Sequence, residues 1–339
     1  MDTPMPPQHR WTIAAFVLAL VTAFGAGVWS MTLSPLEQRA AASPAAAAAR
    51  VPVEQAKATS PHQLRLGTTV TGQGSIVAHG AGTTWIVGHG SLSTIEGGDA
   101  TVVARGPWSA DAIVAPSNEG SMWLASGRFL WPVSATGSVG ERLTPSVGPI
   151  SAVLAANGRT WVAGSDRGHG LLAWIDPWTG DPIQSYYVGA GGYQLAATSG
   201  YVFVATGDPT QPPIVRLDPG MGASVPVPGA QAGPITAGDG RLWWGSAGRV
   251  QCVVARTLRR CGQVPVATPT LLAAHGGALW IVGADPHGAR LVVCDPRTGR
   301  VVAGPVALPG SSVASIAASD ATAWIGTRDP DTVVEVGRA

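Results

Sequence analysis

Histidine, aspartate and arginine side chains recur in short loops along most of this sequence. Imidazole nitrogens, carboxylate oxygens and guanidinium groups are the donors that proteins use to bind metals, anions and polar ligands. The loops follow a series of short apolar segments, each centred on an aromatic residue. The candidate ligand-binding residues in these loops are His89, Asp166, Arg167, His169, Asp208, Asp285, His287, Arg328 and Asp329.

We predict that these loops emerge together on one face of the fold, where their polar groups form a binding surface. The alternative is that they are ordinary solvated loop side chains. Under a catalytic interpretation, His169 and His287 are the residues expected to hold a divalent metal. The sequence contains no Cys-x-x-Cys, Gly-x-Ser-x-Gly, P-loop or His-Glu-x-x-His motif, and no cofactor is predicted.

Two of the three cysteines flank a predicted hairpin. If residues 255–258 form its loop, residue 252 pairs directly with residue 261. We therefore predict a disulfide between Cys252 and Cys261, which would stabilise the fold by roughly 2–3 kcal/mol. Cys294 is predicted to be a buried free thiol. Two further histidines, His79 and His275, precede glycines at equivalent places, and we interpret them as turn residues.

The aromatic segments recur every 37–44 residues from position 62 onward. Each is a short strand, preceded by a tight turn and followed by Gly, Ser or Thr. Seven units of this length, built from short strands, are typical of four-stranded propeller blades. The central aromatic residues, predicted to pack between blades, are Trp85, Trp123, Trp161, Phe203, Trp243, Trp280 and Trp324.

Other repeated features mark the remaining strands of each unit. A strand of small apolar residues precedes each tight turn, as expected for the crowded innermost strand. Asp-Pro-x-x-Gly at 176–180 and 295–299, with a variant at 218–222, predicts the turn between the third and fourth strands. The last unit has a third strand at 332–336 and no fourth, whereas a spare strand at 63–70 precedes the first unit. We predict that this spare strand completes the last blade and closes the ring.

The N-terminal region indicates a membrane anchor. Residues 11–31 carry no charge, and 21 helical residues span about 31 Å, close to the thickness of the bilayer core. A cleaved signal peptide is the alternative, although its apolar core is usually shorter. Residues 1–10 are predicted to be a short cytoplasmic segment. Residues 32–61, rich in Ala and Pro, are predicted to be a linker to the domain at 62–339.

The amino-acid composition and net charge indicate which kinds of partner and which source are expected. Only 12% of the 339 residues are charged and the formal net charge is +1, so nothing favours a nucleic-acid partner. The single lysine, Lys57, against 20 arginines indicates a bacterial genome of high GC content. These features predict an all-β, seven-bladed β-propeller behind one transmembrane helix and a linker. The expected location is the bacterial inner membrane, with the propeller on the extracytoplasmic side.

The Trp-centred strands and the Asp-Pro-x-Thr-Gly turns resemble bacterial seven-bladed propellers of the YVTN type. They resemble more loosely the quinoprotein-like and virginiamycin B lyase-like repeats. The resemblance covers residues 62–339 and implies the fold more than the function. We predict a noncatalytic binding, scaffold or sensor domain for a protein, peptide or glycan. The alternative, implied by the lyase-like repeats, is a metal-assisted lyase or hydrolase. No catalytic residue is assigned.

Overall fold

The computed structural model describes residues 63–338, apart from residues 81, 97, 110, 118, 119, 190, 311 and 329. The predicted segments 1–10, 11–31 and 32–61, together with Asp329, lie outside the described residues. The described residues form strands joined by turns and loops. In this part of the chain, no helix has the length and apolar character needed to cross a bilayer.

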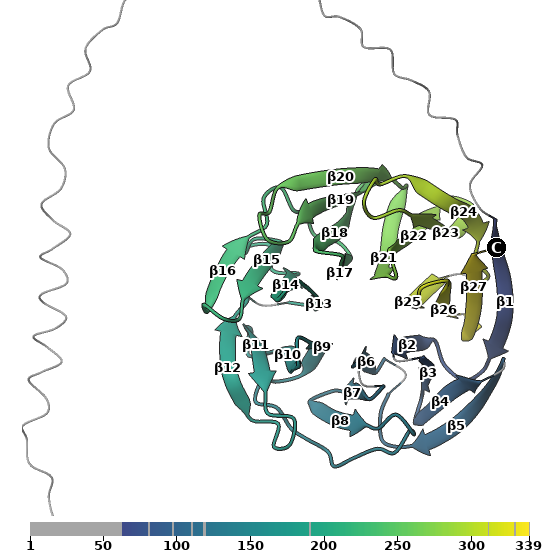
Figure 1. Ribbon diagram of the computed structural model, residues 1–339. Helices are drawn as coiled ribbons and strands as arrows, with labels where there is room; N and C mark the ends of the chain where they lie inside the picture. The colour runs from purple at the N-terminus through teal and green to yellow at the C-terminus, as the bar shows by residue number, and fades with distance from the viewer. Residues whose placement is uncertain are drawn as a thin grey trace, which may run out of the picture. The chain divides into compact units, whose positions relative to one another are not determined.

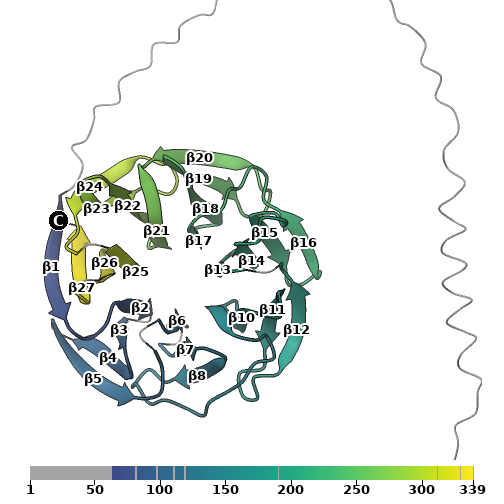
Figure 2. The same cartoon turned by 180° about the vertical axis from the view of Figure 1, so that it is seen from behind.

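Seven antiparallel sheets stand in a ring, as Figure 1 shows, so the predicted seven-bladed propeller is confirmed. We number blade 1 as β2–β5 and follow the chain to blade 7. The first strands lie innermost in both views (Figures 1 and 2) and line a central channel. They are β2 (Ile76–Gly80), β6 (Ile113–Pro116), β9 (Ile150–Ala156), β13 (Tyr193–Thr198), β17 (Ile235–Gly238), β21 (Thr268–His275) and β25 (Ser312–Ala318).

The next two strands of each blade lie progressively farther from the channel. The second strands are β3 (Thr83–Gly88), β7 (Met122–Ser126), β10 (Arg159–Asp166), β14 (Tyr201–Thr206), β18 (Arg241–Ser246), β22 (Ala278–Asp285) and β26 (Thr322–Arg328). The third strands are β4 (Ser91–Glu96), β8 (Phe129–Val133), β11 (His169–Ile175), β15 (Ile214–Asp218), β19 (Arg249–Val254), β23 (Gly288–Cys294) and β27 (Thr332–Arg338).

The outer strands form the rim of the wheel. They are β5 (Asp99–Arg105), β12 (Pro182–Tyr187), β16 (Ala223–Pro226), β20 (Arg260–Pro265), β24 (Val301–Ala307) and β1 (Leu64–Thr71). Blade 2 differs from the predicted pattern, because its sheet contains only three strands. Segment 138–143 lies at the fourth position and touches β8 through isolated bridges. Pro132 of β8 explains the difference, since its backbone has no N–H to donate to a regular fourth strand.

Aromatic residues hold neighbouring blades together, as predicted. Each second strand is buried on both sides because it lies in the middle of a sheet that is covered by two neighbouring blades. The side chains of Trp85, Trp161 and Trp280 are fully buried. The described residues contain seven hydrophobic clusters, and each cluster joins two successive blades. The core is therefore a ring of seven blade interfaces.

The ring closes as the sequence predicts. β1 pairs antiparallel with β27, with Leu64 opposite Arg338 and Thr71 opposite Thr332. The Ser315 hydroxyl in blade 7 donates to the carbonyl of Ser75 at 2.7 Å, just before β2 of blade 1. A Cβ on Gly326 would lie 1.8 Å from that carbonyl oxygen, so the two blades approach closely at this point. The beginning and the end of the described chain thus share one blade.

Because successive strands of a blade run in opposite directions, the connections between them lie on two opposite faces of the propeller. The turns that join first to second strands and third to fourth strands form what we call the turn face. The loops that join second to third strands, with the connections between blades, form the loop face. Asn157, Ser199 and Asp239 adopt the positive φ expected of the turn face. In blade 6, Gly276 and Gly277 take this conformation instead of His275.

Candidate functional site

The loop face carries every candidate residue that the structure describes. His89 lies between β3 and β4, and Asp208 follows β14. Asp166, Arg167 and His169 form the loop of blade 3. Asp285 and His287 lie in blade 6, and Arg328 ends β26 in blade 7. The candidates therefore come from five blades of the ring.

Two carboxylates on the loop face bind groups of their own blades. Asp285 accepts the backbone N–H of His287 at 2.7 Å and forms an ion pair of 2.8 Å with Nε of Arg290. Asp208 accepts the backbone N–H of Thr210 at 2.8 Å and its hydroxyl at 2.6 Å. An aspartate that binds backbone two residues later forms an Asx turn, which gives the loop a defined shape.

The blade 3 loop is a tight hairpin connection. Asp166 pairs with His169 across Arg167 and Gly168, which have φ values of 50° and 81°. Two successive positive φ values are typical of a type I′ turn. The side chains of Asp166, Arg167 and His169 are exposed, and the His169 ring lies 6.5 Å from the Tyr187 ring.

An ion pair links the loops of two blades. Nη2 of Arg328 in blade 7 lies 2.9 Å from Oδ1 of Asp111, in the connection between β5 and β6. Both side chains are largely exposed, so the pair adds little to stability. Asp111 is not among the candidate residues predicted from the sequence, because its partner lies more than two hundred residues later in the chain.

These contacts do not assemble one shared ligand site. In the described part of the chain, no group of three or more His, Cys, Asp or Glu side chains is placed to hold a metal ion. The loop face instead presents separate, locally braced polar loops. Such a surface is suited to an extended partner that touches several loops at once.

The central channel is a second candidate site. Its volume is about 910 Å³, and all seven first strands line it. Alanine is the commonest wall residue, with Ala78, Ala155 and Ala274 as examples, in agreement with the predicted small residues. The volume falls within the usual range for small-molecule sites, which are mostly apolar with a few polar groups.

Polar side chains from three consecutive blades gather at the turn-face mouth of this channel. Nδ1 of His275 in blade 6 lies 3.7 Å from Oδ1 of Asp320 in blade 7. Nδ1 of His79 in blade 1 lies 2.9 Å from the hydroxyl of Thr84. His79 and His275 are predicted from the sequence to be turn residues, and Asp320 is not among the predicted site residues. All three residues line the mouth, where they can exchange protons or hydrogen bonds with a bound ligand.

We expect His79 to titrate below the ordinary histidine pKa of 6.5. Burial lowers its pKa, nearby His275 lowers it further, and the carboxylate of Asp320 opposes both. Asp320→Asn should therefore lower the pKa of His79 further, whereas His275→Gln should raise it. NMR titration of the His79 ring measures both shifts, and a pKa that neither substitution moves would contradict this arrangement.

The same pKa shift has a consequence for stability. Since the pKa of His79 is lower in the folded than in the unfolded chain, the unfolded chain binds this proton first as the pH falls. The free energy of unfolding should therefore decrease below pH 6.5. Chemical unfolding measured at several pH values should show that the free energy of unfolding decreases less in His79→Gln than in the wild type.

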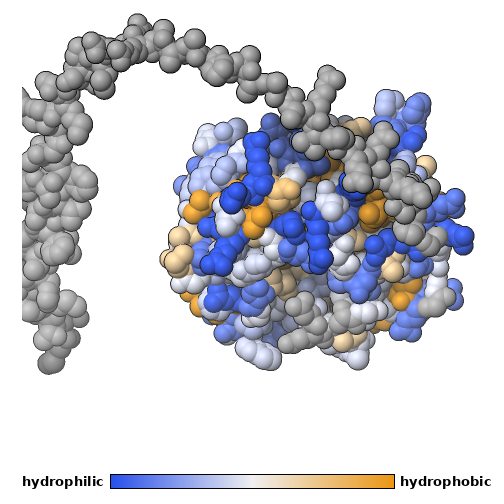
Figure 3. Space-filling model, turned by 45° about the horizontal axis from the view of Figure 1, so that its top comes forward, coloured by the Kyte–Doolittle hydropathy of each residue, from blue (hydrophilic) through white to orange (hydrophobic). Residues whose placement is uncertain are grey.

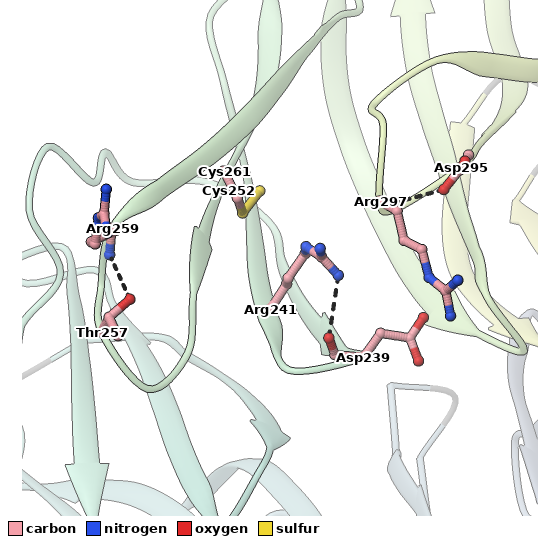
Figure 4. Close-up of a disulfide and its surroundings, with 8 residues drawn as sticks. All are labelled: Asp239, Arg241, Cys252, Thr257, Arg259, Cys261, Asp295 and Arg297. Carbon is pink, nitrogen blue, oxygen red and sulfur yellow. Dashed lines mark hydrogen bonds between the residues drawn. A yellow bond between two sulfur atoms is a disulfide. The ribbon is translucent and has the colours of Figure 1, made fainter.

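A disulfide joins β19 to β20 in blade 5. Cys252 and Cys261 are bonded, with their Cα atoms 5.4 Å apart (Figure 4). The predicted register is wrong by one residue here, because Cys252 pairs with Gly262. Val253 pairs with Arg260, so Cys261 is an extra residue in a bulge. The bulge still places the two side chains on the same side of the sheet edge.

Cys294 is buried and has a free thiol. Burial, with a smaller effect of the Asp295 carboxylate, raises the pKa of Cys294 to about 12. We expect iodoacetamide at neutral pH to leave it unmodified in the folded protein, because the thiolate is the reactive form. Intact mass should show one added group after unfolding without reductant, and three with reductant. Modification of folded protein, or three groups without reductant, would contradict these assignments.

Comparison with known proteins identifies the fold alone. No protein-family profile matches this chain, and no curated protein matches it. Among solved structures, a chain of the Mitotic Checkpoint Complex matches with a TM-score of 0.64, at 12% identity over 89% of this chain and 99% of the other. The WD40 propeller domain of Doa1 gives 0.62, at 15% identity over 81% and 97%. BamB from Moraxella catarrhalis gives 0.53, at 12% identity over 81% and 97%.

Proposed function

We propose that this protein is a noncatalytic binding scaffold, tethered to the bacterial inner membrane with its propeller on the extracytoplasmic side. Its loop face would hold a protein, peptide or glycan partner. The observation that carries this proposal is the place where the chain joins the wheel. Leu64 lies opposite Arg338, whose backbone N–H donates to the carbonyl of Ala321 on the turn face. The described chain therefore begins at the turn face, at the end of the strands opposite the loop face.

The braced loops support the same role. Asp208 and Asp285 hold their loops through backbone hydrogen bonds, and Arg328 joins two blades through Asp111. Loops that are ordered before binding lose less conformational entropy when a partner binds. One matched structure is a chain of the Mitotic Checkpoint Complex, and a place in a complex agrees with a binding role.

The membrane location rests on two independent features. The uncharged segment 11–31 is long enough to cross a bilayer and would place the propeller next to the membrane. The disulfide between Cys252 and Cys261 favours an oxidising compartment, because cytoplasmic thiols are kept reduced. A tethered propeller outside the cytoplasm satisfies both.

Photo-crosslinking in native membranes tests which face binds. A benzoylphenylalanine at His287 would lie on the loop face, and one at Arg297 would lie on the turn face of the same blade. Both native side chains are exposed. We expect a specific adduct with another molecule from position 287 and none from position 297. Adducts from position 297 alone, equal adducts from both, or none from either would contradict the proposal.

A further inference from the structure

Charged residues are unevenly distributed over the turns that join third to fourth strands. In blades 5 and 6, residues 255–260 and 295–300 contain five arginines and one aspartate. In blades 1, 3 and 4, residues 96–99, 176–181 and 218–222 contain five acidic residues and no basic one. Since the whole chain has a formal net charge of only +1, blades 5 and 6 form a distinct basic sector of the turn face.

Four exposed arginines of this sector form what we call the arginine patch: Arg256 and Arg259 in the turn of blade 5, with Arg297 and Arg300 in the turn of blade 6. Figure 4 shows Arg259 and Arg297 on the turns of these neighbouring blades. The two blades are close here, because a Cβ on Gly299 would lie 3.3 Å from the carbonyl oxygen of Gln263 in β20.

The arginine patch has no carboxylate partner in the described part of the chain. None of its four arginines forms an ion pair there. Asp295, the one acid in these turns, accepts the backbone N–H of Arg297 at 2.7 Å and the hydroxyl of Thr298 at 3.0 Å. On the loop face, by contrast, Arg290 and Arg328 are paired with aspartates. The guanidinium groups of the patch can therefore bind an external anion.

The place where the described chain begins identifies that anion. β1 begins at the turn face beside blade 6, since a Cβ on Gly304 of β24 would lie 3.1 Å from Cδ1 of Leu64. Residues 32–61 separate this strand from the uncharged segment 11–31, and even fully extended they span only about 100 Å. A bilayer that holds segment 11–31 is thus always within reach of the patch, and guanidinium groups bind phosphate well.

We propose that the arginine patch binds the phosphate headgroups of the bilayer that anchors the chain. This inference rests on the proposed membrane tether, and it adds a second contact that orients the wheel. Blades 5 and 6 lie against the lipid, the acidic turns of the other blades are held away from it, and the loop face points outward.

Contact through one side of the turn face tilts the wheel. Figures 1 and 2 both place β20 and β24 on the opposite side of the ring from β8. In Figure 3 the top of the molecule, where Figure 1 labels β20 and β24, comes forward, and strongly hydrophilic residues are prominent on the side that it shows. Blade 2 is therefore expected to lie farthest from the lipid.

Energy transfer from a dye on the wheel to a headgroup-labelled lipid measures this orientation. The full-length protein is placed in nanodiscs of phosphatidylcholine, with or without phosphatidylglycerol. Three exposed positions carry the dye in turn: Thr298→Cys beside the patch, His287→Cys on the loop face of the same blade and Thr136→Cys on the turn face of blade 2. The native cysteines do not interfere, since two are bonded and the third is buried.

With phosphatidylglycerol present, the dye at position 298 should transfer more energy than the dye at 136 or 287. The difference should be smaller without phosphatidylglycerol, and it should disappear at about 1 M salt, where the Debye length is only about 3 Å. Equal transfer from the three positions, or a difference that does not depend on phosphatidylglycerol, would overturn the proposal. An acidic protein as the partner of the patch would give equal transfer.

Two triple variants with the same loss of charge isolate the arginines. One removes three arginines of the patch, by Arg256→Gln, Arg259→Gln and Arg297→Gln. The other removes three exposed arginines of the loop face, by Arg128→Gln, Arg167→Gln and Arg249→Gln. Each basic residue near an anionic bilayer strengthens binding about fivefold, so the patch variant should lower the ratio of lipid-bound to free wheel by about a hundredfold. The loop-face variant should leave this ratio unchanged, and equal effects of the two variants would overturn the proposal.

Failure of the tether can be told apart from failure of this contact. A chain that enters nanodiscs of neither composition would contradict the tether. That chain should still float with phosphatidylglycerol vesicles at about 1 mM lipid or more, and not with phosphatidylcholine vesicles. Flotation that the patch variant leaves unchanged, or no flotation, would overturn the arginine contact. A lipid adduct barely changes the mass of the protein, so it is distinct from the partner adducts that photo-crosslinking detects.

Discussion

Replacing Trp280 with alanine is expected to lower the free energy of unfolding by about 3–5 kcal/mol. The side chain is fully buried between blades 6 and 7, where it belongs to one cluster with Val293, Ile325 and Val336. Alanine leaves a cavity that seven interlocked blades cannot collapse without distorting the ring. Chemical denaturation monitored by circular dichroism measures the loss.

Two controls separate packing from other effects of that substitution. Trp178→Ala makes the same change at a side chain that is 86% exposed, and should alter stability by no more than about 0.5 kcal/mol. Trp280→Phe keeps a buried ring. Since Nε1 of Trp280 has no hydrogen-bond partner among the described residues, phenylalanine loses no such bond. A Trp280→Ala variant as stable as Trp178→Ala would refute the role of the aromatic residues between blades.

Breaking the pairing of β1 with β27 should have the second large effect. The N–H of Gly72 donates to the carbonyl of Asp331 at 2.9 Å, so alternation directs the N–H of Val70 toward Val333. Val70→Pro leaves the carbonyl of Val333 without a donor, at a cost of about 1–3 kcal/mol. The proline ring adds a steric conflict with β27. Thermal unfolding of the full-length protein should show a clear decrease in Tm.

Thr71→Pro is the matched control for the closing strand. Thr71 is the next residue of β1, and its N–H points away from β27, where a proline is tolerated. Its Tm should remain near the wild-type value. If Val70→Pro were as stable as Thr71→Pro, the N-terminal strand would not contribute to holding the ring closed.

Repeated local patterns made the fold predictable. Trp280 and its six counterparts recur at one position of the repeat, and the Asp-Pro turns at Asp176 and Asp295 recur at another, so the strand order followed. The spare strand at 63–70 could fill the fourth position of the last blade, which had no strand of its own. The three-stranded sheet of blade 2 could be predicted from Pro132, since a third strand that contains proline cannot bind a regular fourth strand.

The contacts of the candidate site residues were less predictable, because they depend on distances between side chains of different strands and blades. The strand order puts the described candidate residues in loops of one face, but only coordinates show that Asp285 binds Arg290 and that Arg328 binds Asp111. The mouth formed by His79, His275 and Asp320 brings blade 1 next to blades 6 and 7, from opposite ends of the propeller sequence. The one-residue bulge at Cys261 depends on sheet twist, which a hairpin register alone does not reveal.

The central claim is that the propeller lies outside the cytoplasm with its loop face accessible, and thiol labelling in intact cells tests it most directly. A cysteine that replaces His287 would stand on the exposed loop of blade 6. A maleimide that cannot cross the inner membrane should label this variant equally in intact and in lysed cells. The wild type, with Cys294 buried and the other two cysteines bonded, should remain unlabelled. Labelling of the His287→Cys variant only after lysis would contradict the account.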